Sequence, residues 1–137
     1  MKLQAGDERS QVMEEDRLME TLDPELWEFI RTKINSFIKW DLLKLLYSNP
    51  HTVDTAERLA RQCGRSLESV LKSLEEMVKE NLLEMHFVAG IPVYSISKEE
   101  NTRRLVEKFL EACKNRQVRV RVVYHILKEQ EVNFGKG

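Results

Sequence analysis

The sequence predicts a mainly α-helical fold with a small β-hairpin, and three observations support this prediction. Apolar residues recur at helical spacing from residue 24 to about 47. Two shorter helical segments between residues 54 and 80 are bounded by residues that cap helices. The apolar period then changes to that of strands over residues 82–97. With 137 residues, of which only three are Pro and five are Gly, we expect one helix-rich domain with appended segments.

Composition and pattern divide the chain into four segments. Residues 1–22 form an acidic N-terminal segment that we expect to be partly disordered, and residues 131–137 form a loose tail. Residues 23–97 hold an N-terminal helix and the core of the domain. Residues 98–130 form a C-terminal helical segment.

The two ends of the chain carry opposite charge. Residues 1–31 hold four basic and nine acidic residues, a net of −5, whereas residues 101–137 hold nine basic and four acidic residues, a net of +5. Two explanations stay open. The ends pair with each other, within one chain or across a dimer, or the basic end with Arg116, Arg119 and Arg121 meets nucleic acid.

The first long helix has a clear start and a clear end. Asp23 is a good N-cap, and Pro24 is preorganised for the first helical position. The apolar pattern then predicts a helix from 24 to about 47, and a break near Asn35-Ser36 would make two helices of it. Pro50 ends the helix, because the residue before a proline is pushed out of the α region.

Two more helices follow, each with local boundary signals. Asp54, with Glu57 three residues later, predicts the start of the first. Gly64 suits the left-handed position after its end, and Ser66 caps the next helix. Asn81 tolerates the left-handed conformation that closes this helix. The apolar stripe expected on its inner face is Leu67, Val70, Leu71, Leu74, Met77 and Val78.

The hairpin and the C-terminal segment are less sharply marked. Two β-rich runs flank Ala89-Gly90, which predicts a hairpin whose Pro92 sits best at a sheet edge. Residues 115–130 fit either a strand, from alternating valines and arginines, or a helix. We favour the helix, because a single strand here has no partner. Its apolar stripe would be Val120, Val123, Tyr124 and Leu127.

Helices at 54–63 and 67–80, a short turn between them and a hairpin at 82–97 resemble a winged helix–turn–helix domain with extra N- and C-terminal helices. The chain looks most like small ArsR- and MarR-type transcriptional regulators. The resemblance covers about residues 36–97 and rests on element order and apolar spacing. Its most recognisable piece is Ser66…Val70…Leu74…Met77…Asn81-Leu82-Leu83.

The resemblance implies a DNA-binding transcriptional regulator. A recognition helix at about 66–80 would enter the major groove, and a wing at about 82–97 would lie along the adjacent minor groove. Helices 24–47 and 98–127 would form the interface of a homodimer, and the dimer would bind duplex DNA. The implied DNA-binding residues are Arg58, Arg61, Arg65, Ser66, Ser69 and Lys72.

The charge pattern departs from that family. DNA affinity comes largely from Lys and Arg that neutralise phosphates, yet the expected recognition helix holds Glu68 in its first turn and three more glutamates later. The wing tip holds neither Lys nor Arg. The alternative is therefore a winged-helix module for protein–protein interaction with little or no DNA binding, in which the apolar tip and hairpin edge dock a partner.

Nothing in the sequence points to catalysis. It lacks a glycine-rich phosphate loop and the H-E-x-x-H and G-x-S-x-G motifs, so we expect no enzyme activity and no cofactor. Cys63 and Cys113 are far apart and form no C-x-x-C, so we expect reduced thiols and no metal site. A metal- or redox-responsive regulator built on these cysteines and the three histidines is a third hypothesis.

The expected location is the cytoplasm. No apolar run approaches the roughly 18–20 residues that span a bilayer, so we expect no membrane contact. The first residues, MKLQAGDERSQ, lack the apolar segment of a signal peptide.

Overall fold

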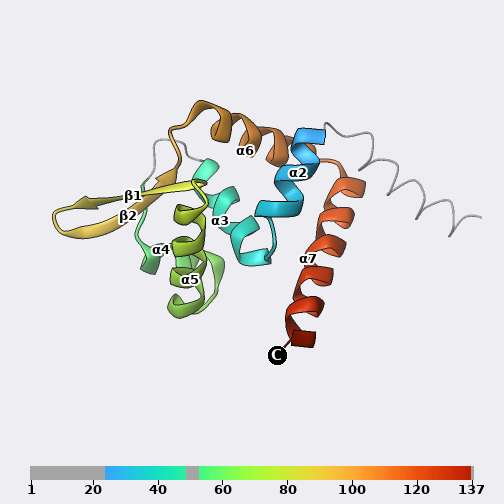
Figure 1. Ribbon diagram of the computed structural model, residues 1–137. Helices are drawn as coiled ribbons and strands as arrows, with labels where there is room; N and C mark the ends of the chain where they lie inside the picture. Colours follow the sequence, from blue (N-terminus) through green and yellow to red (C-terminus); the bar gives the residue numbers. More distant parts are fainter. Residues whose placement is uncertain (1–23, 49–52, 137) are drawn as a thin grey trace, which may run out of the picture. The chain divides into compact units, whose positions relative to one another are not determined.

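The computed structural model describes residues 24–48 and 53–136, with side chains described as far as residue 131. Within these residues the chain forms six helices and one two-stranded antiparallel sheet (Figure 1). The helices are α2 (Pro24–Lys33), α3 (Phe37–Tyr47), α4 (Ala56–Cys63), α5 (Leu67–Lys79), α6 (Glu100–Ala112) and α7 (Arg116–Lys136), and the strands are β1 (Leu83–Val88) and β2 (Ile91–Ile96). The predicted fold class, mainly helical with a small hairpin in a winged-helix-like order, is confirmed. The predicted acidic segment 1–22 lies outside the described residues.

The chain divides into two compact units. One is Ser36–Lys108, which holds α3, α4, α5, the hairpin and most of α6. The other combines the chain up to Asn35 with the chain from Phe109 onward, so it holds α2, the end of α6 and α7. No helix in the described part of the chain is both long and apolar enough to cross a membrane.

The long N-terminal helix is in fact two helices, as the break expected near Asn35-Ser36 allowed. Ser36 has an extended backbone with φ of −153°, and its hydroxyl accepts a hydrogen bond from the backbone N–H of Lys39. This is N-cap geometry, so α3 starts afresh after α2 ends at Lys33. The separation lies at the boundary between the two units.

The helix–turn–helix is formed by α4 and α5. Thr55, and not Asp54, caps α4, because the Thr55 hydroxyl accepts from the backbone N–H of Arg58. The predicted cap was therefore wrong by one residue. Asp54 instead bridges to β2: its N–H donates to Tyr94 O at 3.1 Å, and Tyr94 N–H donates to Asp54 O at 2.8 Å. Gly64 is left-handed with φ of +68°, as predicted.

The buried face of α5 differs from the predicted stripe. Val70, Leu74 and Met77 are buried, but Leu67 and Leu71 are exposed, so their assignment to the core was wrong. The helix buries Ser73 in addition. The inner face is set by the elements that α5 contacts, which are α3, α4 and β1, and these lie elsewhere in the sequence.

The hairpin has the predicted centre and a simple register. β1 and β2 pair antiparallel from Leu83↔Ile96 at the base to Val88↔Ile91 at the tip. Ala89 and Gly90 both have positive φ, +51° and +79°, as a two-residue type I′ turn requires. Asn81, with φ of +62°, turns the chain from α5 toward β1.

The ambiguous C-terminal segment is helical, as favoured, but it buries another face. Val118, Val122 and Ile126 are buried, whereas most of the predicted stripe is exposed. The backbone of the predicted loose tail, residues 131–137, continues α7 as far as Lys136. In the same unit the Phe29 and Phe109 rings lie 6.0 Å apart.

Candidate nucleic-acid interface

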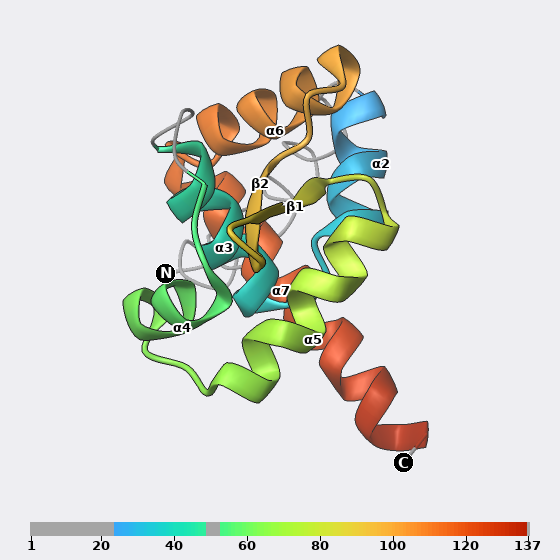
Figure 2. The same cartoon turned by 90° about the vertical axis from the view of Figure 1, so that its left-hand side faces the viewer.

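The six residues predicted to bind DNA lie on two adjacent helices and the turn that joins them. All six are exposed. We call this set the α4–α5 surface: Arg58 and Arg61 on α4, Arg65 and Ser66 in the turn, and Ser69 and Lys72 on α5. In the two cartoon views, α4 and the N-terminal half of α5 lie below the hairpin (Figures 1 and 2).

The α4 arginines flank an open hollow. Arg58, Arg61 and Gln62 line it, and its volume is about 370 Å³. Arg58 Nε lies 3.2 Å from Oδ1 of Asp54, whose side chain is buried. Arg61 has no ion-pair partner in the described part of the chain. The hollow therefore presents one unpaired guanidinium and one that a buried carboxylate holds in place.

Arg65 is less free than the sequence suggested. Its Nη2 lies 3.0 Å from Oδ2 of Asp41 on α3, and Asp41 also pairs with Lys44 at 3.3 Å. Arg65 and Asp41 are 24 residues apart, so local sequence signals do not reveal the pair. A phosphate would have to compete with Asp41 for this guanidinium.

The first turn of α5 uses its serines locally. The Ser66 hydroxyl oxygen accepts from Ser69 N–H at 3.2 Å, and the Ser66 hydroxyl donates to the Ser69 hydroxyl at 2.9 Å. Ser66 is thus primarily the cap of α5. Ser69 and Lys72 remain exposed one turn apart, and Lys72 has no ion pair among the described residues.

Half of the glutamates on α5 and its C-cap have a structural partner. Lys39 Nζ lies 3.1 Å from Oε2 of Glu76 and 3.1 Å from Oε1 of Glu80. The lysine side chain is only 3% exposed. Of these four glutamates, only Glu68 and Glu75 therefore remain as exposed acids without a lysine partner in the described part of the chain. The sequence alone made α5 look more repulsive to DNA than it is.

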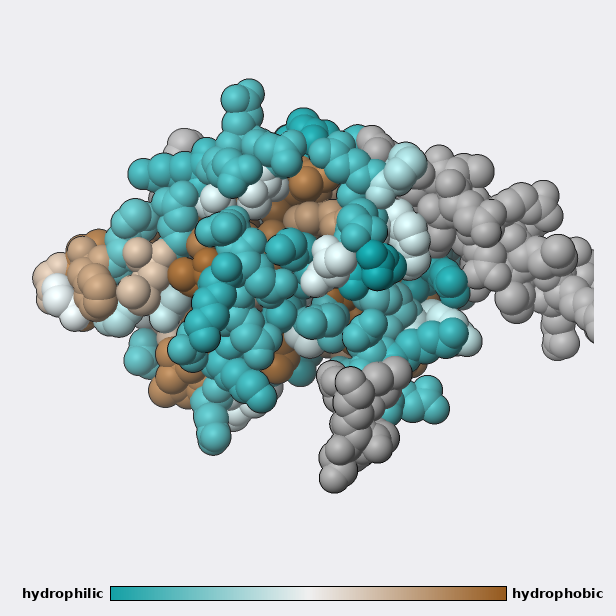
Figure 3. Space-filling view, in the orientation of Figure 1, coloured by the Kyte–Doolittle hydropathy of each residue, from teal (hydrophilic) through white to brown (hydrophobic). Residues whose placement is uncertain are grey.

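The outer part of the hairpin is apolar and uncharged. Phe87, Val88 and Ile91 are each more than half exposed, and Figure 3 shows the hairpin end as a hydrophobic region. No Lys, Arg, Asp or Glu occurs between Met85 and Ser97. This wing has no side chain with a formal positive charge that could contact a phosphate.

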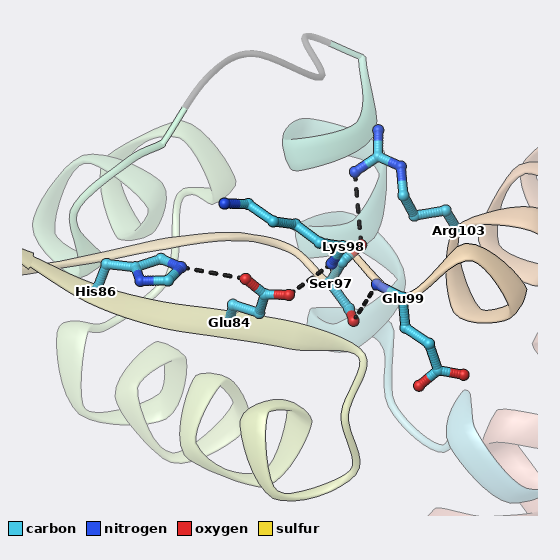
Figure 4. A network of polar contacts seen from close by, with 6 residues as sticks. All are labelled: Glu84, His86, Ser97, Lys98, Glu99 and Arg103. Atoms are coloured by element: carbon cyan, nitrogen blue, oxygen red, sulfur yellow. Dashed lines mark hydrogen bonds and ion pairs between the residues drawn. The ribbon is translucent and has the colours of Figure 1, made fainter.

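The base of the wing is tied to the start of α6 by polar contacts (Figure 4). Glu84 accepts a 2.6 Å hydrogen bond from Lys98 N–H and lies 3.1 Å from Nε2 of His86. The Lys98 N–H, followed by His86, holds the pKa of Glu84 below its ordinary value. Ser97 accepts from Glu99 N–H with its hydroxyl and from Arg103 with its carbonyl. Glu84, the acid at the base of the wing, is therefore already partnered.

The described residues contain no cluster of side chains that supports the metal-responsive hypothesis. In residues 24–48 and 53–136, no three His, Cys, Asp or Glu side chains gather as a metal ion would require. Cys63 is half-buried and Cys113 is buried, and neither forms a disulfide. Burial raises the pKa of the Cys63 thiol.

No protein-family model matches the chain, and no curated protein matches it in sequence. One similar solved structure is described as a possible transcriptional regulator from Methanosarcina mazei Go1. The two chains are 13% identical, and the match covers 77% of this chain and 81% of that one, with a TM-score of 0.40.

Proposed function

We propose that the chain is a non-enzymatic, DNA-binding transcriptional regulator that holds duplex DNA on the α4–α5 surface. The observation that carries the proposal is the helix–turn–helix followed by a hairpin, with the cations Arg61 and Lys72 exposed and unpaired on its two helices. Such an arrangement lays the second helix in the major groove and sets the first across the backbone.

Each residue then has a distinct role. Arg58 and Arg61 bind phosphate oxygens at the hollow that they line. Ser66 positions the start of α5, and Ser69 and Lys72 reach toward base edges from its first two turns. Arg65 joins the phosphate contacts when it leaves Asp41.

The charge balance predicts binding that is modest and sensitive to salt. The Ser36–Lys108 unit carries eleven basic and eleven acidic residues, so its net charge is zero. Long-range attraction of this unit to DNA is therefore weak, and binding depends on the few cations of the α4–α5 surface.

A double charge reversal tests the proposed interface. Arg61→Glu with Lys72→Glu should abolish binding to duplex DNA in fluorescence anisotropy at low salt. Lys79→Glu is the matched control, because Lys79 is exposed at the far end of α5. Equal affinity of the double variant and the wild-type chain would refute this interface.

We further propose that the regulator is a homodimer, with α7 in the interface. Val120, Tyr124 and Leu127 are exposed and recur on one side of α7. Within the described helices α2 and α3, by contrast, no large apolar side chain is exposed. Among the helices predicted to form the dimer, the exposed apolar surface therefore lies on α7 and not on the helices over 24–47.

A second candidate function is a protein-interaction module. It is favoured by the uncharged, apolar wing, whose Phe87 is 66% exposed. Exposed apolar patches of this kind mark interaction surfaces. This surface does not overlap the α4–α5 surface, so the two functions are compatible in one chain.

A further inference from the structure

Strand β1 has a free edge whose hydrogen-bonding groups can be identified from the register. Val88 and Ile91 flank the two-residue turn, so they form a hydrogen-bonded pair. Pairs alternate along an antiparallel ladder, which makes Phe87↔Pro92 and Met85↔Tyr94 non-hydrogen-bonded pairs.

Two residues of β2 agree with this alternation. Pro92 has no N–H to give to β1, and Tyr94 directs its own N–H and C=O to Asp54 on the other side. Met85 and Phe87 must therefore point their N–H and C=O groups away from β2. In the described part of the chain the sheet has two strands, ordered β1-β2, so no strand covers this edge.

The side chains along this edge offer no protection against pairing. Met85 is 40% exposed and Phe87 is 66% exposed, and both share a face of the hairpin with their partners Tyr94 and Pro92. Natural edge strands are usually blocked by lysines, other charges or bulges. Here His86 is the only titratable side chain from Met85 to Val93.

We propose that β1 pairs antiparallel with β1 of a second copy of this chain, about a two-fold axis at His86. Met85 then lies opposite the partner's Phe87, and Phe87 opposite the partner's Met85. The outward N–H and C=O groups of Met85 and Phe87 in each β1 are satisfied, and the two hairpins become one four-stranded sheet with a continuous apolar face. This assembly does not rest on the proposed DNA binding.

A second copy of this chain suits the free edge of β1, because the edge is uncharged and an antiparallel pairing of two β1 strands is symmetric. A nucleic acid or a charged peptide would find no countercharge between Met85 and Ser97. The nearest acid, Glu84, is already held by Lys98 N–H and His86. A single self-pairing step also covers two exposed copies of Phe87, whereas a foreign strand would cover one.

Cysteine cross-linking tests the register directly, in a chain with Cys63→Ser and Cys113→Ala. At the two-fold axis the His86 positions form a non-hydrogen-bonded pair with Cα atoms about 4.5 Å apart, which suits a disulfide. His86→Cys should give a disulfide-linked dimer on mild oxidation. Ile91→Cys, equally exposed but on β2, is the matched control. Failure of His86→Cys to cross-link, or equal cross-linking of both variants, overturns the proposal.

Sedimentation of the full chain provides a second, independent readout. Phe87→Lys should weaken self-association about tenfold or more, because a lysine ammonium from each copy must be desolvated at the apolar interface. Ile91→Lys adds the same charge to β2, which would be an outer strand of the four-stranded sheet, and should change self-association little. Equal self-association of the wild-type chain and the Phe87→Lys variant would contradict wing pairing.

DNA anisotropy on the same variants separates this inference from the proposed function. Loss of cross-linking with intact DNA binding would remove only the wing pairing. Cross-linking without DNA binding would remove only the regulator proposal.

Discussion

Lys39 Nζ lies 3.1 Å from Oε1 of Glu80, and the lysine side chain is 3% exposed. Glu76, one turn earlier on α5, lies at the same distance from Nζ. The pair joins α3 to the end of the proposed recognition helix. It explains the presence of Glu76 and Glu80 near the end of a helix that would be expected to carry lysines or arginines if it binds DNA.

The first prediction concerns this buried lysine. Glu76→Gln combined with Glu80→Gln leaves the ammonium buried without a carboxylate, which should cost about 2–4 kcal/mol of unfolding free energy. Lys39→Met should cost less than about 1 kcal/mol, because an apolar side chain of similar length suits the site. Urea denaturation of the two variants measures both values. A larger loss in Lys39→Met than in the double variant would contradict this explanation.

The second prediction is a substitution that increases affinity for duplex DNA. Asp41→Asn removes the carboxylate that pairs with Arg65 and Lys44, so both cations become available to phosphates. Affinity for duplex DNA should rise by roughly two- to fivefold, in proportion to the modest strength of an exposed ion pair. Anisotropy titration at fixed salt measures the change. Glu111→Gln, which removes the exposed partner of Lys114 in the other unit, is the control and should leave affinity unchanged.

The helix boundaries were predictable from sequence because they depend on neighbouring residues. Gly64, Ser66 and Asn81 act on their own turns, and each has the conformation or the cap that the sequence indicated. The order of elements followed from these boundaries. The cap of α4 was displaced by one residue because Asp54 pairs instead with β2, forty residues later.

The buried faces and the ion pairs were not predictable in the same way. On α7 the stripe with Val118 is buried, and the stripe with Tyr124 is not, although both have helical spacing. The choice depends on which elements pack there, and a single sequence does not contain that information locally. The pairs Lys39–Glu80 and Arg65–Asp41 likewise join residues 41 and 24 positions apart.

The exposed stripe of α7 gives a third prediction. Tyr124→Glu places a charge in the proposed dimer interface and should convert dimers to monomers. The measurement is sedimentation velocity in the Phe87→Lys background, so that pairing through the wing does not contribute. Gln130→Glu adds the same charge at an exposed position elsewhere on α7 and should leave the dimer intact. A monomeric parent, or a Tyr124→Glu variant that stays dimeric, would exclude this interface.

The fourth prediction is a pH dependence of stability from His125. Burial lowers its pKa below the ordinary 6.5, and its ring packs edge-on to Trp27 at 6.0 Å. Below pH 6.5 the unfolded chain therefore binds a proton more readily than the folded chain does. The stability that neutral His125 contributes is therefore fully present above pH 6.5. It is lost as the pH falls from 6.5 toward the lower pKa that His125 has in the folded chain.

Denaturant unfolding measured across this pH range checks the His125 prediction. His125→Gln should flatten the dependence, because glutamine does not titrate there. His86→Gln, at an exposed position in the other unit, is the control and should retain it. An unchanged pH profile in His125→Gln would assign the effect to another group.

The most direct measurement for the central claim is the salt dependence of duplex DNA binding. Arg58, Arg61 and Arg65 are the proposed phosphate contacts of the α4–α5 surface, and each phosphate contact contributes a slope of about −0.9 to log affinity against log salt. We expect measurable binding at low salt with a slope of roughly −2 to −3 per protomer. No binding at low salt, or binding with a slope near zero, would contradict it.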